Sequence, residues 1–162
     1  MHKTKLAFDD SLGGNSNSAN NSLKMNANAP FYQHQHLFVR EIHLRGTGWD
    51  GSHHQELMLH LQGGSLLRIS RNNGEDTFQI GAHAGNYNTL VVRHISANTI
   101  TCRQVLAAFG NERRLRPTYD HADCRTFAQD IFTALDPGAN TAIAEASGGR
   151  GDESKLIADL FG

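Results

Sequence analysis

Alternation of apolar and polar residues is the clearest pattern in the middle of the chain. In QELMLHLQ, Leu57, Leu59 and Leu61 occupy every second position, which is the period of a strand with one face turned to a core. Glycines at 63–64 and an Asn-Gly pair at 73–74 separate this segment from SLLRISR and DTFQIG. Such turn residues join antiparallel strands, so we expect a three-stranded meander. Two further strands are expected in HLFVREIHL (36–44) and NTLVVRHI (88–95).

Helical spacing replaces alternation in the last third of the chain. A short helix is expected between a cap at Thr99 or Thr101 and Gly110. A second helix repeats apolar residues every four positions, from Phe127 to Leu135, and Asp136-Pro137-Gly138 should end it. Strands therefore come first and helices follow. The expected fold class is α+β, with an antiparallel sheet of four to six strands packed against the second helix, which carries a cysteine.

The chain reads as one domain with two polar ends. Residues 1–30 are rich in Asn, Ser and Gly, and such a composition cannot bury enough apolar surface to offset the entropy of ordering. We therefore predict a disordered arm at 1–30 and a folded domain at 31–137. Residues 138–162 are expected to form a flexible tail, with a short helix in SKLIADLF (154–161).

Composition excludes several classes of function. With 15 basic and 16 acidic residues, the net charge of -1 provides no electrostatic footprint for nucleic acid or an anionic membrane. No apolar run approaches the roughly 20 residues that span a bilayer, and the N-terminus has no apolar signal region. Two cysteines suit a reducing compartment. We therefore expect a soluble protein, with a cytoplasmic location favoured, no integral membrane association and no nucleic-acid partner.

Cys124 lies at the start of the second predicted helix, on the side of Phe127 and Ala128. A thiol there lies near unpaired N–H groups and the positive end of the helix dipole, which favour the thiolate. Burial among apolar neighbours is the competing interpretation, in which the cysteine is a small packing residue. Spacing alone leaves both interpretations open.

A nucleophilic cysteine needs an imidazole to take its proton and deliver it to the leaving group. His53 and His54 stand just before the first strand of the meander, after the Gly-rich loop GTGWDGS. Strand ends beside loops are where rigid scaffolds present catalytic groups. Either histidine is a candidate base, because an irregular start to the strand can exchange which ring faces inward.

The order of these features resembles the circularly permuted papain-like thiol enzymes of NlpC/P60 type, which include lecithin:retinol acyltransferase-like proteins and PPPDE peptidases. The matching residues are a histidine at the start of a strand and the segment YDHADCRTF, from Tyr119 to Phe127, which is similar to the family's NCxxF helix. The resemblance covers about residues 36–136. It implies a permuted papain-like fold with Cys124 as nucleophile, His54 as base and His53 as its competitor.

The resemblance also implies a polar group that orients the imidazole, and Ser70 or Asn72 is expected across from His54. Hydrolysis or acyl transfer through an acyl-enzyme is the implied activity, on a peptide, amide or acyl substrate and without a cofactor. The backbone N–H of Cys124 would help to hold the oxyanion. The chain departs from the family at Asp123-Cys124-Arg125. A catalytically inactive binding module, with the arm and tail engaging a protein partner, is therefore the alternative.

Histidines are numerous, at 10 in the chain, and some could assemble a zinc site. His34 and His36 share one face of an extended segment, and further histidines follow on the predicted strands. No acidic or cysteine partner was evident at ligand spacing. The favoured interpretation is scattered surface histidines, with no metal site.

Overall fold

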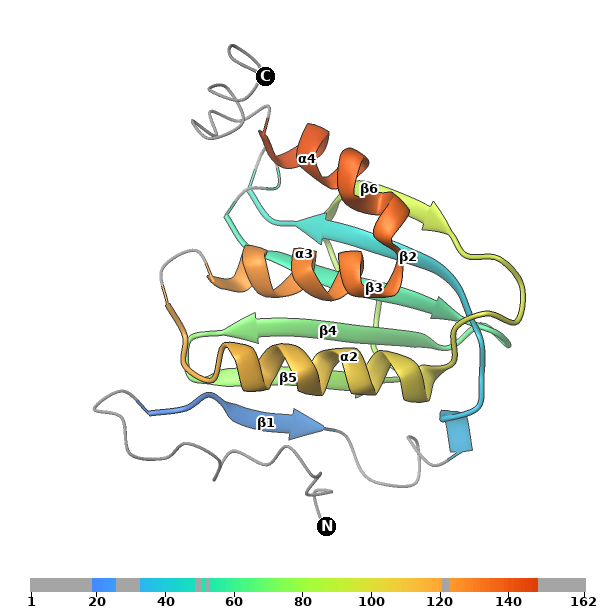
Figure 1. The fold of residues 1–162 in the computed structure, drawn as a ribbon, viewed down its shortest axis with the longest axis horizontal. Coiled ribbons are helices and arrows are strands. Elements are labelled where there is room, and N and C mark those ends of the chain that lie inside the picture. Colours follow the sequence, from blue (N-terminus) through green and yellow to red (C-terminus); the bar gives the residue numbers. More distant parts are fainter. Residues whose placement is uncertain (1–18, 26–32, 49–50, 52, 121–122, 149–162) are drawn as a thin grey trace.

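The structure is a computed structural model that describes residues 19–25, 33–48, 51, 53–120 and 123–148. One sheet carries all the strands, and the helices cover one of its faces (Figure 1). The strands are β1 (Ser22–Met25), β2 (Val39–Gly46), β3 (Gln55–Leu61), β4 (Leu66–Asn72), β5 (Glu75–Ile80) and β6 (Asn88–His94). The helices are α2 (Cys102–Leu115), α3 (Asp123–Leu135), the 3-10 helix η1 (Pro137–Ala139) and α4 (Asn140–Gly148).

Strand order in the sheet is β1-β5-β4-β3-β2-β6. Strands β3, β4 and β5 form the predicted three-stranded meander. The two further predicted strands extend it, with β2 antiparallel to β3 and β6 antiparallel to β2. At the other edge β1 pairs with β5 in parallel. The prediction of an α+β fold with up to six strands is confirmed, but the sheet is mixed and the prediction of a wholly antiparallel sheet is wrong.

The first strand also corrects the predicted disordered arm at 1–30. Ser22–Met25 forms β1, with Met25 in the core, and Asn21 before it is only 1% exposed. Its side chain donates hydrogen bonds to Asp76 and to the carbonyl of Asn72. The stabilisation comes from partners distant in the sequence, so local composition did not indicate it. The rest of the predicted arm lies outside the described residues, apart from Ala19 and Asn20.

The predicted boundary between the folded domain and the C-terminal tail, at residues 137–138, also differs from the structure. The predicted tail begins with η1 and α4, which bury Ala139 and Ile143, and α4 packs against β6. Ala142 and Ala146 pack partly buried beside them, so most of the apolar side chains that anchor this segment are alanines, which give a weak periodic pattern. The helix predicted at 154–161 lies outside the described residues.

The first predicted helix is longer than expected. Thr101, one of the two predicted caps, is the N-cap of α2 and forms a capping box with Gln104. The helix then continues through Gly110 to Leu115. Buried Phe109 and Arg113 on either side hold it against the sheet, so tertiary contacts outweigh the weak helix propensity of glycine.

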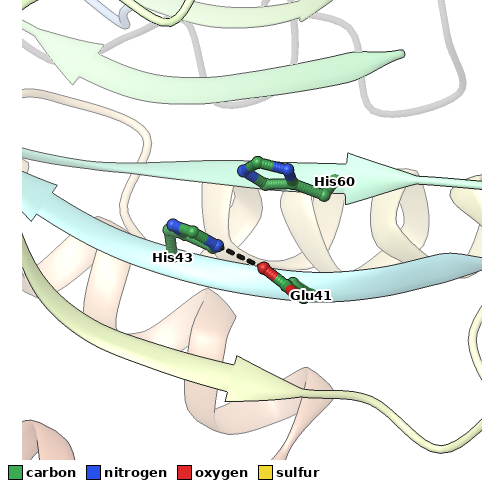
Figure 2. Close-up of side chains that lie close together, drawn as sticks. All are labelled: Glu41, His43 and His60. Atoms are coloured by element: carbon green, nitrogen blue, oxygen red, sulfur yellow. Dashed lines mark hydrogen bonds and ion pairs between the residues drawn. The ribbon is translucent and has the colours of Figure 1, made fainter. Parts of the chain in front are cut away.

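Side chains of β2 and β3 alternate between two faces of the sheet. One set, which includes Glu41, His43 and His60, lies on the face away from the helices (Figure 2). The loop after β5 covers another part of this face, where Arg45 bonds the carbonyl of Ala84 and stacks over Tyr87. The outer face is therefore polar and partly shielded.

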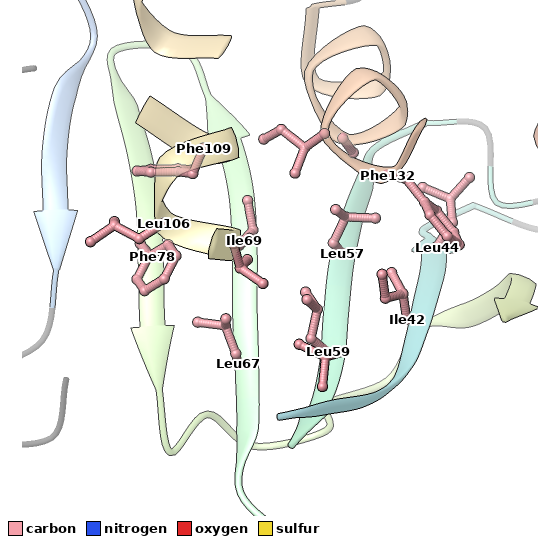
Figure 3. Close-up of a cluster of buried hydrophobic side chains, with 14 of the residues drawn as sticks. Ile42, Leu44, Leu57, Leu59, Leu67, Ile69, Phe78, Leu106, Phe109 and Phe132 are labelled. Carbon is pink, nitrogen blue, oxygen red and sulfur yellow. The ribbon is translucent and has the colours of Figure 1, made fainter. Parts of the chain in front are cut away.

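The other set of side chains forms the core beneath the helices (Figure 3). Apolar residues of all six strands meet aromatic residues of α2 and α3, with Phe109 between Phe78 and Phe127. Helix α3 lies over β3 and β4, as the apolar spacing of its sequence requires. Among the described residues, no helix is both long and apolar enough to cross a bilayer.

Candidate active site

Helix α3 and strand β3 begin at the same end of the sheet (Figure 1). Cys124 lies in the first turn of the helix, and His54 immediately precedes the strand. The two side chains share a hydrogen bond, although 70 residues of chain separate them. The structure thus brings together the cysteine and one of the two histidines that the sequence singled out.

His53 is directed elsewhere. Its side chain is exposed, and its ring lies against Gly48, where an added Cβ would come within 2.9 Å of the ring atoms. Gly48 also has a φ of 87°, a conformation that favours glycine. The loop before β3 therefore holds the two histidines in different environments, and only His54 contacts the thiol.

A buried carboxylate completes the group. Glu56, two residues after His54, is 0% exposed, and its Oε1 lies 3.6 Å from His54 Nε2. Arg45 approaches the same carboxylate at 2.6 Å and Arg68 at 3.1 Å. We refer to Cys124, His54 and Glu56 as the Cys-His-Glu cluster.

Glu56 was not among the residues predicted from the sequence, in which Ser70 or Asn72 was expected to orient the imidazole. The Ser70 hydroxyl is buried and, among the described residues, has no hydrogen-bond partner. Asn72 is exposed at the end of β4, where its backbone carbonyl accepts from Asn21. The available signal was spacing: alternate residues of a strand share a face, so a glutamate two positions after His54 lies beside it.

The surroundings of His54 favour its protonated form. The hydrogen bond with Cys124 and then that with Glu56 outweigh burial and raise the pKa of His54 to about 9. Burial by itself raises the pKa of Glu56, but His54, Arg45 and Arg68 together hold it below its ordinary value. At neutral pH the cluster therefore pairs an imidazolium with a carboxylate.

Two opposing effects act on Cys124. Burial raises the pKa of its thiol, whereas hydrogen bonds from His54, the Gln55 backbone N–H and the Tyr119 hydroxyl lower it. The bonds prevail, and the pKa is below its ordinary value. Burial raises the pKa of the Cys102 thiol to about 12. The two cysteines of the chain are both buried, but only Cys124 is placed to ionise.

Gln55 holds the helix and the strand together beside the sulfur. Its side-chain oxygen accepts from Gln129 of α3 at 2.7 Å, and its amide donates to the carbonyl of Gly51. The bond to Gly51 is buried and the bond to Gln129 is partly buried, and Gln55 itself is 0% exposed. They fix the spacing between the start of β3 and helix α3, and hence between His54 and Cys124.

A second group of side chains has the composition of a metal site. Glu41, His43 and His60 present ligand atoms that all lie within 4.8 Å of one another. The sequence analysis set zinc aside because no acidic partner was evident, yet Glu41 stands two residues before His43 on β2. We refer to these three residues as the Glu-His cluster.

Comparisons of the chain with protein-family models, with curated proteins and with solved structures gave no significant match.

Proposed function

We propose that the protein is a thiol-dependent hydrolase or acyltransferase that acts through an acyl-enzyme on Cys124. The observation that carries this proposal is the hydrogen bond between Cys124 and His54, with Glu56 Oε1 3.6 Å from Nε2 of the same ring. This is the arrangement of nucleophile, base and orienting group that acyl transfer requires. The substrate classes are those expected from the sequence: a peptide, an amide or an acyl ester.

In the proposed reaction, the Cys124 thiolate attacks the carbonyl carbon of the substrate. The imidazolium of His54 donates its proton to the leaving group as the carbonyl bond to that group breaks, which leaves a thioester on Cys124. Water, or an acceptor hydroxyl or amine, then loses a proton to His54 and attacks the thioester. The thiolate departs and the ion pair is restored.

Glu56 and the start of α3 have supporting roles in this scheme. The carboxylate orients the ring of His54 and stabilises its charge, and its two arginine partners keep it ionised. The backbone N–H of Cys124, in the first turn of α3, would donate to the oxyanion of the tetrahedral intermediate.

The arrangement of elements supports, as part of the proposal, a permuted papain-like fold. A histidine precedes a central strand of the sheet, and the cysteine follows later in the chain at the start of a helix packed on that sheet. The second candidate is a binding module on the same scaffold without catalytic activity. The low exposure of Cys124, at 5%, favours this alternative, since a nucleophile must meet its substrate.

An activated acyl ester tests the proposal without knowledge of the natural substrate. We expect p-nitrophenyl acetate to acetylate Cys124, detected by mass spectrometry of peptides, and to be turned over as the thioester hydrolyses. Cys124→Ala should abolish both signals. His54→Ala should slow acetylation by about 100-fold or more, the lower range for loss of general acid–base catalysis.

His53→Ala is the matched control, since it removes the neighbouring imidazole that does not contact the thiol. It should leave both rates near those of the unmodified chain. Acetylation of Cys124 that is equally fast in the His54 and His53 variants would contradict the proposal. Absence of acetylation in a folded protein would favour the binding module.

A further inference from the structure

We propose that the Glu-His cluster binds a divalent transition-metal ion of the Zn²⁺ type. The cluster lies on the outer face of the sheet, away from the helices (Figure 2). It is separate from the Cys-His-Glu cluster, because His60 and Glu56 are four residues apart on β3, about 13 Å along a strand. The inference is independent of the proposed function.

Strand pairing is what assembles the three ligands. Glu41 of β2 is the register partner of His60 on β3, and His43 lies two residues further along β2 on the same face. Glu41 Oε1 and His43 Nε2 are 2.8 Å apart. Two imidazoles and one carboxylate thus converge from rigid strands rather than from loops.

The ligand set selects the class of ion. Imidazole nitrogen together with one carboxylate oxygen suits Zn²⁺ and its neighbours Co²⁺, Ni²⁺ and Cu²⁺, whereas Mg²⁺ and Ca²⁺ require mainly oxygen ligands. With both histidines neutral, Glu41 gives the three ligands a charge of about -1, which favours a divalent cation.

Binding requires a small rearrangement of the side chains. The rings of His43 and His60 are stacked, with centroids 4.2 Å apart and planes 22° apart. A metal ion lies in the plane of each imidazole that binds it, so the rings must turn until their lone pairs meet. Ligand atoms of a tetrahedral site are about 3.3 Å apart, which is within reach from 4.8 Å by side-chain rotation.

A fourth coordination position is available on the exposed side. His94 of β6 is the other register partner of Glu41, and its Nδ1 lies 3.3 Å from Glu41 Oε2. The His94 side chain is 82% exposed, so its rotation toward the ion displaces solvent rather than packed side chains. Glu41 and His94 also line a cavity of about 500 Å³, so water can fill the fourth position when His94 does not.

Cobalt and zinc titrations of the full chain, purified without a histidine tag, test the site. The parent protein for these titrations carries Cys124→Ala, because a thiolate beside His54 would itself attract zinc. We expect one equivalent of Co²⁺ to bind and give the visible absorption bands of a nitrogen- and oxygen-ligated ion. Zinc should displace it, and calorimetry should give the same stoichiometry.

Variants assign the ion to the cluster. Each of the variants His43→Ala, His60→Ala and Glu41→Gln should weaken Zn²⁺ binding by at least about tenfold. Loss of a residue that only hydrogen-bonds a metal ligand already costs about this much, and these three residues would bind the ion directly. His94→Ala should have a smaller effect. His53→Ala and His83→Ala remove exposed histidines outside the cluster and should leave affinity unchanged.

Circular dichroism and melting of each metal-free variant check that the fold is retained, and His60→Gln replaces any alanine variant that fails to fold. Absence of Zn²⁺ binding to the parent protein would overturn the proposal. Binding that survives in the folded His43 and His60 variants would overturn it equally, because the ion would then have other ligands.

Discussion

Burial opposes ionisation of the Cys124 thiol, whereas hydrogen bonds favour it. The net result is a lowered thiol pKa, which distinguishes Cys124 from Cys102. Burial acts on both thiols, but only Cys124 receives hydrogen bonds from an imidazole, a backbone N–H and a phenol. Because the thiolate is the reactive form, a difference in thiol pKa becomes a difference in nucleophilic rate. The two cysteines can therefore be compared within one molecule.

We predict that iodoacetamide near neutral pH modifies Cys124 at least about tenfold faster than Cys102. The reason is that a thiol pKa lower by one unit or more increases the thiolate fraction by about tenfold or more. Mass spectrometry of peptides at several reaction times measures both rates. In denaturant the two rates should become similar. Equal or reversed rates in the folded protein would mean that access, not ionisation, governs Cys124.

His54 also differs from an ordinary histidine, because it keeps its positive charge at neutral pH. Its pKa of about 9 lies above the ordinary value of 6.5, so the imidazolium persists at neutral pH and is lost only as the pH rises through about 9. The pKa of Cys124 lies below its ordinary value of 9.0. Between these two pKa values the thiolate–imidazolium pair is the main form.

We predict that His54→Ala raises the pKa of Cys124 by at least about one unit, because the cation that favours the thiolate is removed while the helix dipole remains. Thiolate absorbance at about 240 nm measures the titration. Glu56→Gln should raise this pKa less than His54→Ala does, since the carboxylate acts through the ring. His53→Ala should change little, and an effect as large as that of His54→Ala would contradict the assignment.

Helices α2 and α3 meet through a pair of acidic side chains. Burial and a hydrogen bond with Asp130 raise the pKa of Glu112 to about 7, and Arg116 only partly offsets this. The folded protein therefore holds a proton on this pair that the unfolded chain releases near the ordinary pKa of 4.5. As the pH rises from about 4.5 to 7, this group progressively destabilises the fold.

We predict that Glu112→Gln removes this contribution, because the amide stays neutral over the whole range. The free energy of unfolding, measured by urea denaturation between pH 5 and 8, should fall less steeply with pH in the variant than in the unmodified protein. The comparison of slopes separates Glu112 from groups that titrate equally in both proteins. Parallel curves would show that Glu112 ionises normally.

On the scale of the whole molecule, a buried polar network ties the N-terminal strand to both layers. Asp76 of β5 is 0% exposed and bonds Arg71 at 2.7 Å and Arg113 of α2 at 3.0 Å. Asn21 donates to the same carboxylate, and its own carbonyl accepts from Arg113. Removing one member leaves buried charge unsatisfied, which is costly.

This network bears on the stability contributed by the N-terminal segment, which the sequence predicted to be a disordered arm at 1–30. We predict that deletion of residues 1–18 changes the melting temperature little, whereas deletion of 1–26 lowers stability by about 3 kcal/mol or more, through lost hydrogen bonds and an uncovered edge of β5. Asn21→Ala in the full chain isolates the polar part and should cost about 1–3 kcal/mol. Equal melting of the two truncated chains would show that β1 adds no stability.

The sequence by itself determined the elements whose signal is local. Alternation at Leu57, Leu59 and Leu61 identified β3, and apolar spacing in DCRTFAQDIFTAL identified α3. These patterns arise because each strand or helix must turn one face to the core. They also placed Cys124 at a helix start and His54 at a strand start, although they left His53 as a competitor of His54.

Tertiary structure decided whatever depends on partners far apart in the chain. Strand β1 has only four residues and little pattern, and Asn21 directly before it is held by Asp76 and Arg113, more than 50 residues away. Glu56 lies beside His54, buried and held between two arginines, and Glu41 meets His60 because β2 pairs with β3 in one register. A sequence pattern specifies which face a side chain occupies, whereas strand pairing and helix packing decide what that side chain meets there.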